Sequence, residues 1–394
     1  MSKKMKKRIR ILILLLILAG AGGFLFARWR AQQPVREGLA AMEQENYSGA
    51  IRIFQNAAAH DSMNKEYCYY MGMAYLLSGS YEDADKQFSL ALNVDQKYEA
   101  VYRGYGILRY QQGRYEEAVA YFNQALDSHG LMIGEMEYDI LRYRMESETA
   151  LGDYEGALET CASLIELEGE SSDLYCSMGN LYCRLDRKED AMQAYDKAVV
   201  RGNASYSMFW KMYDSLNEAG WTENAVTYLE MTETDGCIST DNITAAELRR
   251  NRGMVAYFCG RYADAIKLLG DVTLSSDVQA QTYLALAYEA NGNRQSALKI
   301  LKAQANGSTS PNAYLLVAEY YIKYGEAQKA INFLKRGITK CEGKDVQALE
   351  HTLVTAYEAG GQYEQAREAL KKYQDEYGDS EEIEAELEYI ELKL

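Results

Sequence analysis

Small and aromatic residues recur along this 394-residue chain at a spacing of 34 positions. Four columns keep one register over three periods: Gly38, Gly72 and Gly106; Ala50, Ala84 and Ala118; Phe54, Phe88 and Phe122; Ala57, Ala91 and Ala125. A period of this length is typical of one structural unit that is repeated along the chain and buries its core against neighbouring copies. The pattern therefore predicts a repeat array rather than a single globular core.

A six-residue phrase, G-x-Y-x-x-A, lies inside this period. It begins at Gly79, Gly113, Gly152, Gly260 and Gly361. Glycine readily takes the left-handed conformation that ends a helix, and an acidic residue in the following turn meets the positive end of the next helix dipole. The alanine is expected where the two helices touch, so the phrase predicts a helix-turn-helix.

These columns resemble the tetratricopeptide repeat, a unit of about 34 residues with alanine at position 20 and an aromatic near position 24. With position 20 as anchor, the resemblance gives ten repeats, at Ala50, Ala84, Ala118, Ala157, Ala191, Ala225, Ala265, Ala297, Ala330 and Ala366. It implies an all-α fold, a right-handed superhelical solenoid of about ten helix-turn-helix repeats. The last repeats are looser, because leucine replaces phenylalanine at Leu301, Leu334 and Leu370.

The chain departs from the family at the junctions between repeats, where proline is usual near position 32. Its two prolines, Pro34 and Pro311, fall elsewhere. The junction sites hold residues such as Ser62, Gln96, Gly130 and Asn203. Glycine, asparagine and serine are therefore expected to set the helix ends.

The N-terminal segment differs from the array. Residues 1–10 hold six basic side chains and no acidic one, and residues 11–27 follow without a charge. As a helix, this uncharged run would span about 26 Å, slightly short of a hydrocarbon core of about 30 Å, with Trp29 at the interface. The pattern predicts a transmembrane anchor with residues 1–10 in the cytoplasm and the repeats on the far side of the cytoplasmic membrane.

A cleaved signal peptide is the alternative, and the protein would then be secreted. The small residues 19–23 could supply a processing site. Apolar residues resume at Phe24, Leu25 and Phe26, which favours the uncleaved anchor.

Charge excludes some partners. The chain carries a net charge of −16, and since residues 1–27 contribute six positive charges, the remainder carries −22. Nucleic acid and anionic lipid would repel such a surface.

Cysteines and histidines do not form a site in the sequence. The seven cysteines are scattered, and Cys68, Cys161 and Cys183 occupy positions of small apolar residues, which predicts core packing. Unpaired thiols suit a reducing or anaerobic setting, which weakens the extracytoplasmic prediction. His60, His129 and His351 lie far apart. We therefore expect no enzyme activity, no metal and no cofactor.

The resemblance implies that the first helix of each repeat lines an inner, concave wall through positions 2, 5, 9, 12 and 13. Those positions supply the candidate partner-binding residues Tyr69, Met73, Leu77, Arg103, Ile107, Tyr110, Arg142, Asn180, Arg184, Trp210, Asp214, Asn217, Arg250, Met254 and Tyr257. Aromatic, methionine and arginine side chains suit an extended peptide or a partner helix. The alternative is that these residues pack against neighbouring repeats.

A chaperone-type carboxylate clamp is not supported. Family members with this clamp carry lysine at position 5 and asparagine at position 9 of one repeat. Here Arg142 stands with Glu146, and Cys176 with Asn180.

Two polar loops, residues 128–137 and 232–244, divide the array into blocks. The predicted blocks are repeats 1–3 at residues 31–132, repeats 4–6 at 138–239 and repeats 7–10 at 246–380. Bending at the loops would change the width of the groove. A capping helix is predicted at 381–394, with Asp379 as N-cap and Glu382 at its third position.

Together these features predict a non-enzymatic, membrane-anchored scaffold that binds a protein or peptide partner. The anchor style favours a bacterial origin. One alternative is an accessory factor of an envelope, secretion or polysaccharide-export machine. Another is a cytoplasm-facing receptor of inverted topology.

Overall fold

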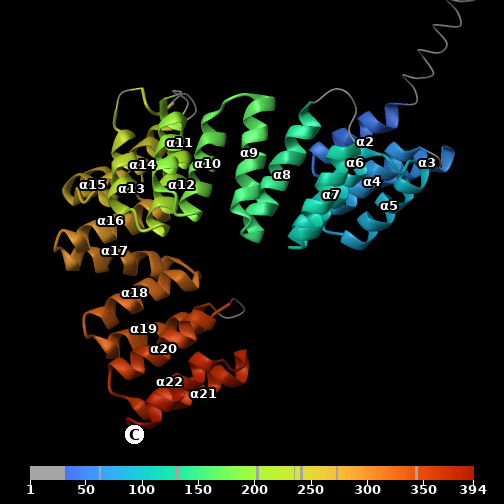
Figure 1. The fold of residues 1–394 in the computed structure, drawn as a ribbon. Helices are drawn as coiled ribbons and strands as arrows, with labels where there is room; N and C mark the ends of the chain where they lie inside the picture. Colours follow the sequence, from blue (N-terminus) through green and yellow to red (C-terminus); the bar gives the residue numbers. More distant parts are fainter. Residues whose placement is uncertain are drawn as a thin grey trace, which may run out of the picture. The chain divides into compact units, whose positions relative to one another are not determined.

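The structure, a computed structural model, describes residues 32–61, 64–128, 134–200, 204–234, 236–239, 243–271, 274–341 and 345–394. Across these residues the fold is all-helical, with twenty-one α-helices, α2 to α22 (Figure 1). The predicted N-terminal anchor, residues 11–27, lies outside them. None of the described helices combines the length and the apolar character that crossing a bilayer requires.

The helices follow one another in consecutive pairs, one pair for each predicted repeat. The first five pairs are α2 (Gln33–Glu43) with α3 (Tyr47–His60), α4 (Lys65–Leu77) with α5 (Tyr81–Val94), α6 (Glu99–Gln111) with α7 (Tyr115–Ser128), α8 (Glu135–Leu151) with α9 (Tyr154–Glu168), and α10 (Ser172–Arg184) with α11 (Lys188–Val200). In each of these pairs the two helices pack against each other.

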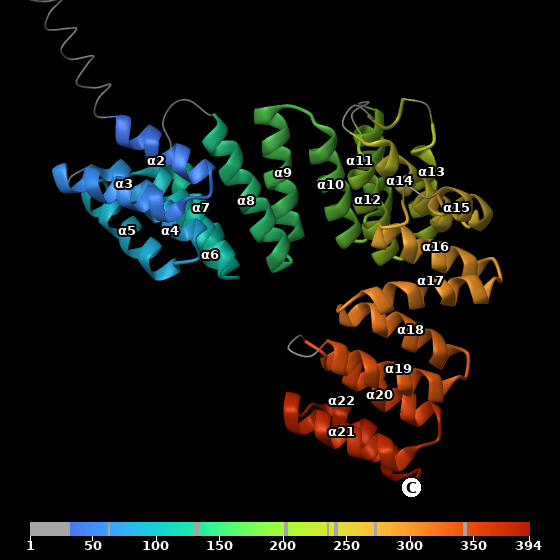
Figure 2. The same ribbon diagram turned by 180° about the vertical axis from the view of Figure 1, so that it is seen from behind.

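The remaining helices continue this order. They are α12 (Tyr206–Glu218) and α13 (Thr222–Met231), α14 (Ala245–Phe258) with α15 (Tyr262–Leu269), α16 (Val278–Ala290) with α17 (Arg294–Gly307), α18 (Pro311–Lys323) with α19 (Ala327–Lys340), α20 (Gln347–Ala359) with α21 (Tyr363–Tyr377), and the single last helix α22 (Glu381–Glu391). Figure 2 shows the same succession from behind.

The helices group into two compact units. Unit 1 takes in the described part of Met1–Arg201 together with Asp214–Gly220, and unit 2 the described part of Gly202–Tyr213 together with Trp221–Leu394. The loops at 128–137 and 232–244 lie inside unit 1 and unit 2 respectively, where their described parts connect α7 to α8 and α13 to α14.

The anchor alanines form the centre of each repeat. All ten, from Ala50 to Ala366, have no exposed surface. In repeats 1, 2, 3 and 5 a glycine at position 8 lies directly under the aromatic ring at position 24, which is also fully buried. A Cβ built on Gly72 would lie 2.5 Å from Phe88, and one on Gly106 would lie 2.3 Å from Phe122. The glycine and phenylalanine columns therefore recur together because the ring takes the space of the missing side chain.

The turn inside every repeat passes through a left-handed residue at position 15. Eight of the ten are glycines, Gly79, Gly113, Gly152, Gly220, Gly260, Gly292, Gly325 and Gly361, with φ between 68° and 80°. Glu45 (φ 57°) and Asp186 (φ 55°) take the same conformation. The next amide donates to the carbonyl of position 11, as Ser80 does to Tyr75 at 2.8 Å, which closes the helix end. The prediction that glycine ends the first helix is confirmed.

Polar side chains start many of the helices. Asn46, Asn64, Asp153, Ser171, Asp277 and Asn293 each accept a hydrogen bond from a backbone N–H of the helix that follows. Pro311 occupies the first turn of α18, where no intrahelical donor is lost. The predicted cap of the last helix is wrong by one residue, because Ser380 rather than Asp379 accepts from Ile383.

Candidate functional site

The predicted partner-binding residues do not all reach the surface. Tyr69, Ile107 and Met254 are buried, with exposed fractions of 6%, 3% and 5%. Leu77 is 44% exposed. Met73, Tyr110, Asn180, Trp210, Asn217 and Tyr257 are partly exposed, and Asp214 is exposed. The three buried side chains offer little area to a partner.

All four predicted arginines are paired with carboxylates. Arg103 contacts Asp139 at 2.5 Å, Arg142 contacts Glu168 at 2.5 Å, Arg184 contacts Glu218 at 2.6 Å and Arg250 contacts Asp277 at 3.1 Å. The partner carboxylate of Arg103 belongs to the next repeat, and so does that of Arg184, so these ion pairs connect neighbouring repeats. The guanidinium groups are thus already neutralised within the chain.

One of these pairs extends to a buried phenol in unit 1. The Nη1 of Arg103 donates to the hydroxyl of Tyr69 at 3.1 Å, and its Nε donates to Asp139 at 2.6 Å. Burial raises the pKa of Tyr69 above its ordinary value, and the charge of Arg103 offsets part of that rise. Tyr69, Arg103 and Asp139 therefore connect the first helices of repeats 2, 3 and 4.

Six partly exposed aromatic side chains gather in unit 2, and we call them the aromatic face: Trp210, Tyr213, Tyr257, Phe258, Tyr262 and Tyr283. Phe258 lies at the centre of the group. Its ring centroid is 5.4 Å from Trp210, 4.9 Å from Tyr213 and 5.4 Å from Tyr283, with tilted or edge-on geometry. Tyr257 adjoins Tyr262 at 5.9 Å and Tyr283 at 5.5 Å.

Sequence reasoning found two members of the aromatic face, Trp210 and Tyr257, and missed the other four. Tyr213 and Tyr283 stand at positions 8 and 6 of their repeats, which the family pattern does not direct toward a partner. Phe258 stands at position 13, which the family pattern does direct toward a partner, but it was not among the predicted residues. Burial raises the pKa of Tyr257, and the neighbouring phenols Tyr262 and Tyr283 raise it further, so the hydroxyl of Tyr257 stays protonated at neutral pH.

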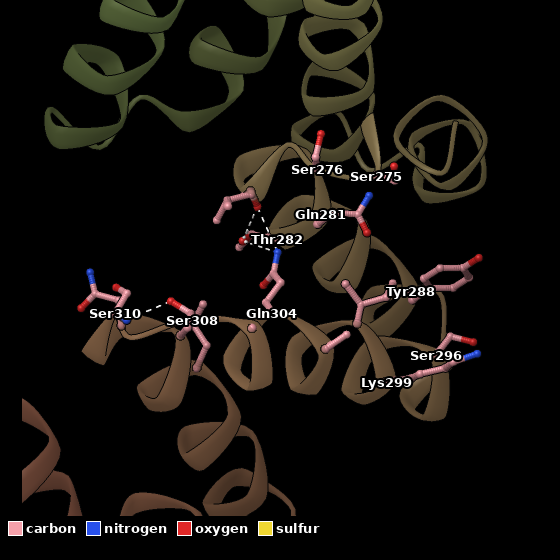
Figure 3. A pocket seen from close by; sticks show the side chains of 17 residues that line it. Ser275, Ser276, Gln281, Thr282, Tyr288, Ser296, Lys299, Gln304, Ser308 and Ser310 are labelled. Carbon is pink, nitrogen blue, oxygen red and sulfur yellow. Dashed lines mark hydrogen bonds between the residues drawn. The ribbon is translucent and has the colours of Figure 1, made fainter. Parts of the chain in front are cut away.

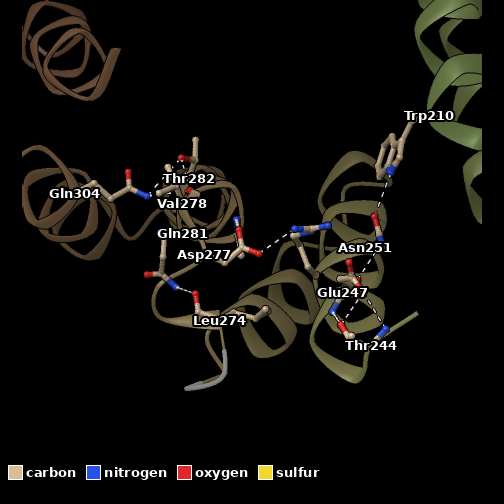
Figure 4. A network of polar contacts seen from close by, with 12 residues as sticks. Trp210, Thr244, Glu247, Asn251, Leu274, Asp277, Val278, Gln281, Thr282 and Gln304 are labelled. Atoms are coloured by element: carbon tan, nitrogen blue, oxygen red, sulfur yellow. Dashed lines mark hydrogen bonds and ion pairs between the residues drawn. The ribbon is translucent and has the colours of Figure 1, made fainter. Parts of the chain in front are cut away.

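Polar contacts connect the aromatic face to the first helix of repeat 7 (Figure 4). The indole Nε1 of Trp210 faces Asn251 at 3.4 Å, and Asn251 donates to the carbonyl of Glu247 at 3.0 Å. Glu247 completes a capping box with Thr244 at the start of α14. The indole of Trp210 thus contacts an amide side chain that is itself held by the backbone of α14.

A second group of polar contacts lies at the start of α16 (Figure 4). Asp277 accepts from the amide of Ala280 at 2.9 Å as N-cap and also holds Arg250. Gln304 of α17 donates to the carbonyl of Val278 at 3.1 Å and lies 3.5 Å from the hydroxyl of Thr282. Position 27 usually holds alanine. In this repeat it holds Gln304, whose side chain connects α17 to α16 through a hydrogen bond, and we call this contact the polar tie.

A groove of about 1030 Å³ lies beside this tie, and we call it the α17 groove (Figure 3). Its lining runs along α17 from Ser296 to Gly307 and includes residues of α16, from Val278 to Tyr288, and of α18, from Asn312 to Leu316. Its lining combines hydroxyl and amide side chains with apolar ones, and Lys299 is its single charged residue.

No metal-binding cluster of histidine, cysteine or carboxylate occurs among the described residues. Cys68, Cys161, Cys176, Cys183 and Cys341 are buried, which confirms the core positions predicted for Cys68, Cys161 and Cys183. His60 ends α3, and His351 pairs with Glu386 of α22 at 2.8 Å. His129 lies outside the described residues.

Several segments match sequence profiles of the tetratricopeptide repeat. They are residues 41–108, 86–133, 103–173, 172–199 and 353–380. Residues 259–337 match a profile described as anaphase-promoting complex, cyclosome, subunit 3. The chain is therefore a tetratricopeptide-repeat protein, as the columns predicted.

One curated relative is the heat-shock protein cognate co-chaperone sgt12 of Aspergillus fumigatus, 31% identical over 94 residues. The match covers 24% of this chain and 28% of the relative, so the chain spans well under a third of that protein.

Two solved structures are similar to this chain at low sequence identity. PilF of Pseudomonas aeruginosa is 17% identical with a TM-score of 0.43, over 52% of this chain and 90% of that one. PilW, described as a widely conserved type IV pilus biogenesis factor, is 14% identical with a TM-score of 0.44, over 52% and 96%. These scores leave the role of this chain open.

Proposed function

We propose that this chain is a membrane-anchored scaffold that binds a protein partner through the aromatic face, with its repeats outside the cytoplasm. Tetratricopeptide-repeat proteins are generally non-catalytic and bind proteins. The observation that carries the proposal is the aromatic face itself. Clustered, partly exposed tryptophan and tyrosine side chains are the residue types that dominate the binding energy of protein interfaces.

The electrostatics favour a partner segment with basic or apolar side chains. The predicted arginines are paired within the chain, and the net charge beyond residue 27 is −22. A lysine or arginine of the partner would meet an attractive long-range field and an aromatic surface suited to cation–π contacts.

Site-specific photocrosslinking in cells tests the aromatic face. A photoreactive phenylalanine at Tyr213 replaces one ring of the face by another, whereas the same residue at the exposed Gln328 of α19 is the control. We expect a discrete crosslinked protein with the first variant and none with the second. Equal crosslinking at both sites, or none at Tyr213, would contradict the proposal.

The partner's identity then separates the scaffold from its first alternative. Crosslinks to integral membrane subunits that also co-purify with the chain would favour an accessory factor of an envelope or export machine. A crosslinked protein that is not part of such an assembly would favour the scaffold.

The anchor rests on the six basic side chains of residues 1–10 and the uncharged run 11–27. A membrane fraction that resists alkaline extraction and retains the N-terminal peptide by mass spectrometry is the expected result. Release of the protein into the medium without that peptide would favour the signal-peptide alternative.

A test of membrane topology by thiol labelling needs an accessible cysteine. Cys237 is a poor choice, because burial raises its pKa and so lowers the fraction of reactive thiolate. Val200 is 85% exposed at the end of α11. A Val200→Cys variant that carries Cys237→Ser and Cys259→Ser should react with an impermeant maleimide on intact cells. Reaction only after lysis would favour the cytoplasm-facing receptor.

A further inference from the structure

We propose that the α17 groove is a second docking site, which takes a short peptide segment of a partner with apolar side chains and a carboxylate. This site lies on other residues than the aromatic face, so either can fail without the other.

The groove borders the segment that follows the short second helix of repeat 7. Helix α15 has 8 residues, whereas α5, α7, α17 and α19 have 14 each. After α15, Leu274 is buried in one core cluster with Ala280 of α16, and the next residues, Ser275 and Ser276, line the groove. Val278 at the first position of α16 is 71% exposed and also lines it.

The shape of the groove suits a peptide. The lining positions on α17, from Ser296 to Gly307, extend over about 17 Å at 1.5 Å per residue. An extended chain of about five residues has that length. The volume of about 1030 Å³ lies at the upper end of sites that enclose single small molecules.

The lining has an apolar floor with polar groups at its edge. Ile300 of α17 and Leu316 of α18 are partly buried, and Ala303 of α17 is exposed and contributes only a methyl group to the lining. Gln304 donates through Nε2 to the carbonyl of Val278, which also accepts from the hydroxyl of Thr282, and both side chains line the groove. Such groups can pair with the main chain of an extended segment while the floor takes its apolar side chains.

The charge of the groove lining differs from that of the whole chain and indicates which partner the groove can bind. The chain has 58 acidic residues, yet none of them lines the groove. Lys299 is exposed and takes part in none of the ion pairs found among the described residues. A partner carboxylate can therefore pair with Lys299, whereas a partner lysine would find no carboxylate in the lining.

Selection of displayed peptides on the full-length protein tests the proposal. The probe is a random library of 12-residue peptides, and the binding of fluorescent copies of the enriched peptides is then measured by anisotropy. We expect enriched peptides to combine apolar residues with aspartate or glutamate. Ala303→Trp fills the floor and should weaken their binding about tenfold or more, a loss of about 1.4 kcal/mol or more.

Matched variants separate the groove from general effects. Ala120→Trp places the same ring on the exposed surface of α7 and should leave binding within about twofold. Lys299→Glu should weaken acidic peptides, and Lys335→Glu on α19 should not. Trp210→Ala should leave these peptides bound.

Peptides that are net basic, that bind Ala303→Trp as well as the natural chain, or that fail to enrich at all would overturn the proposal. Loss of binding in Trp210→Ala alone would assign the peptides to the aromatic face and would equally overturn it.

Discussion

Two residues in the turns carry conformational strain that their counterparts in other repeats avoid. Glu45 and Asp186 hold the left-handed conformation at position 15, where the other eight repeats have glycine. A side chain in this conformation costs roughly 1 kcal/mol or more relative to glycine. Aspartate tolerates it better than glutamate, because its short side chain can bond locally.

Replacing these residues by glycine should stabilise the fold. We expect Glu45→Gly to raise the free energy of unfolding by about 1 kcal/mol and Asp186→Gly by less. Urea unfolding followed by circular dichroism measures both. The reverse change, Gly113→Ala, should destabilise, and a neutral effect there would show that the left-handed turn is not required.

The glycines under the aromatic rings give a second prediction at this scale. Gly106→Ala would place a Cβ 2.3 Å from Phe122, so we expect a loss of about 1–3 kcal/mol from overpacking.

Repeats 8 and 9 pair alanine with leucine at the same two positions, as Ala285 with Leu301 and Ala318 with Leu334. The double variant Gly106→Ala with Phe122→Leu should therefore recover part of the loss. Additive losses in the double-mutant cycle would contradict this explanation of the columns.

At the scale of single elements, the last helix α22 brings a glutamate close to a partly buried glutamate of α20. Glu358 of α20 has a buried carboxylate oxygen without a hydrogen-bond partner. Burial raises its pKa, and the charge of Glu386 on α22 raises it further. The folded state therefore binds a proton at Glu358 more readily than the unfolded chain does.

Glu358→Gln should stabilise the C-terminal repeat at neutral pH. With a raised folded-state pKa, the ionised carboxylate opposes folding above that pKa, and the penalty disappears as pH falls below the ordinary value of 4.5. The advantage of the variant in thermal melts should thus shrink between pH 7 and pH 4. Glu381→Gln on the exposed start of α22 is the control, and an advantage independent of pH would contradict the proposed cause.

The repeat elements could be predicted from the sequence and the surfaces could not. Columns such as Ala50 to Ala366 recur because the two helices of each repeat pack against each other at the same positions. The partner of Arg103 is Asp139, 36 positions later, and no periodic rule within a repeat identifies it. Nor does the repeat phrase indicate the α17 groove, because its lining joins side chains of α16, α17 and α18.

At the scale of the whole molecule, the two compact units should respond separately to core substitutions. Trp210 and Trp221 both belong to unit 2. In a Trp29→Phe background, tryptophan fluorescence therefore reports on unit 2 and circular dichroism on all helices. Phe88 in unit 1 and Leu334 in unit 2 are both fully buried at position 24 of their repeats, so their truncation tests the same position in each unit.

Leu334→Ala should shift the fluorescence midpoint in urea, since such truncations cost about 2–5 kcal/mol. Phe88→Ala should shift the circular dichroism curve and leave the fluorescence midpoint in place, because stability in repeat arrays is local. Equal shifts of both signals by both variants would show a single cooperative unit instead.

Because the backbone has the same conformation at position 15 of every repeat, the chain can be cut and rejoined at this position between any two repeats. Excision of residues 80–113 would join Gly79 to Arg114, so that α4 would be followed by α7 through an unchanged turn, with Gly72 facing Phe122. Chain length can then change by whole units without a new junction. An array assembled in this way can gain or lose a binding surface in one genetic step while its core contacts stay the same.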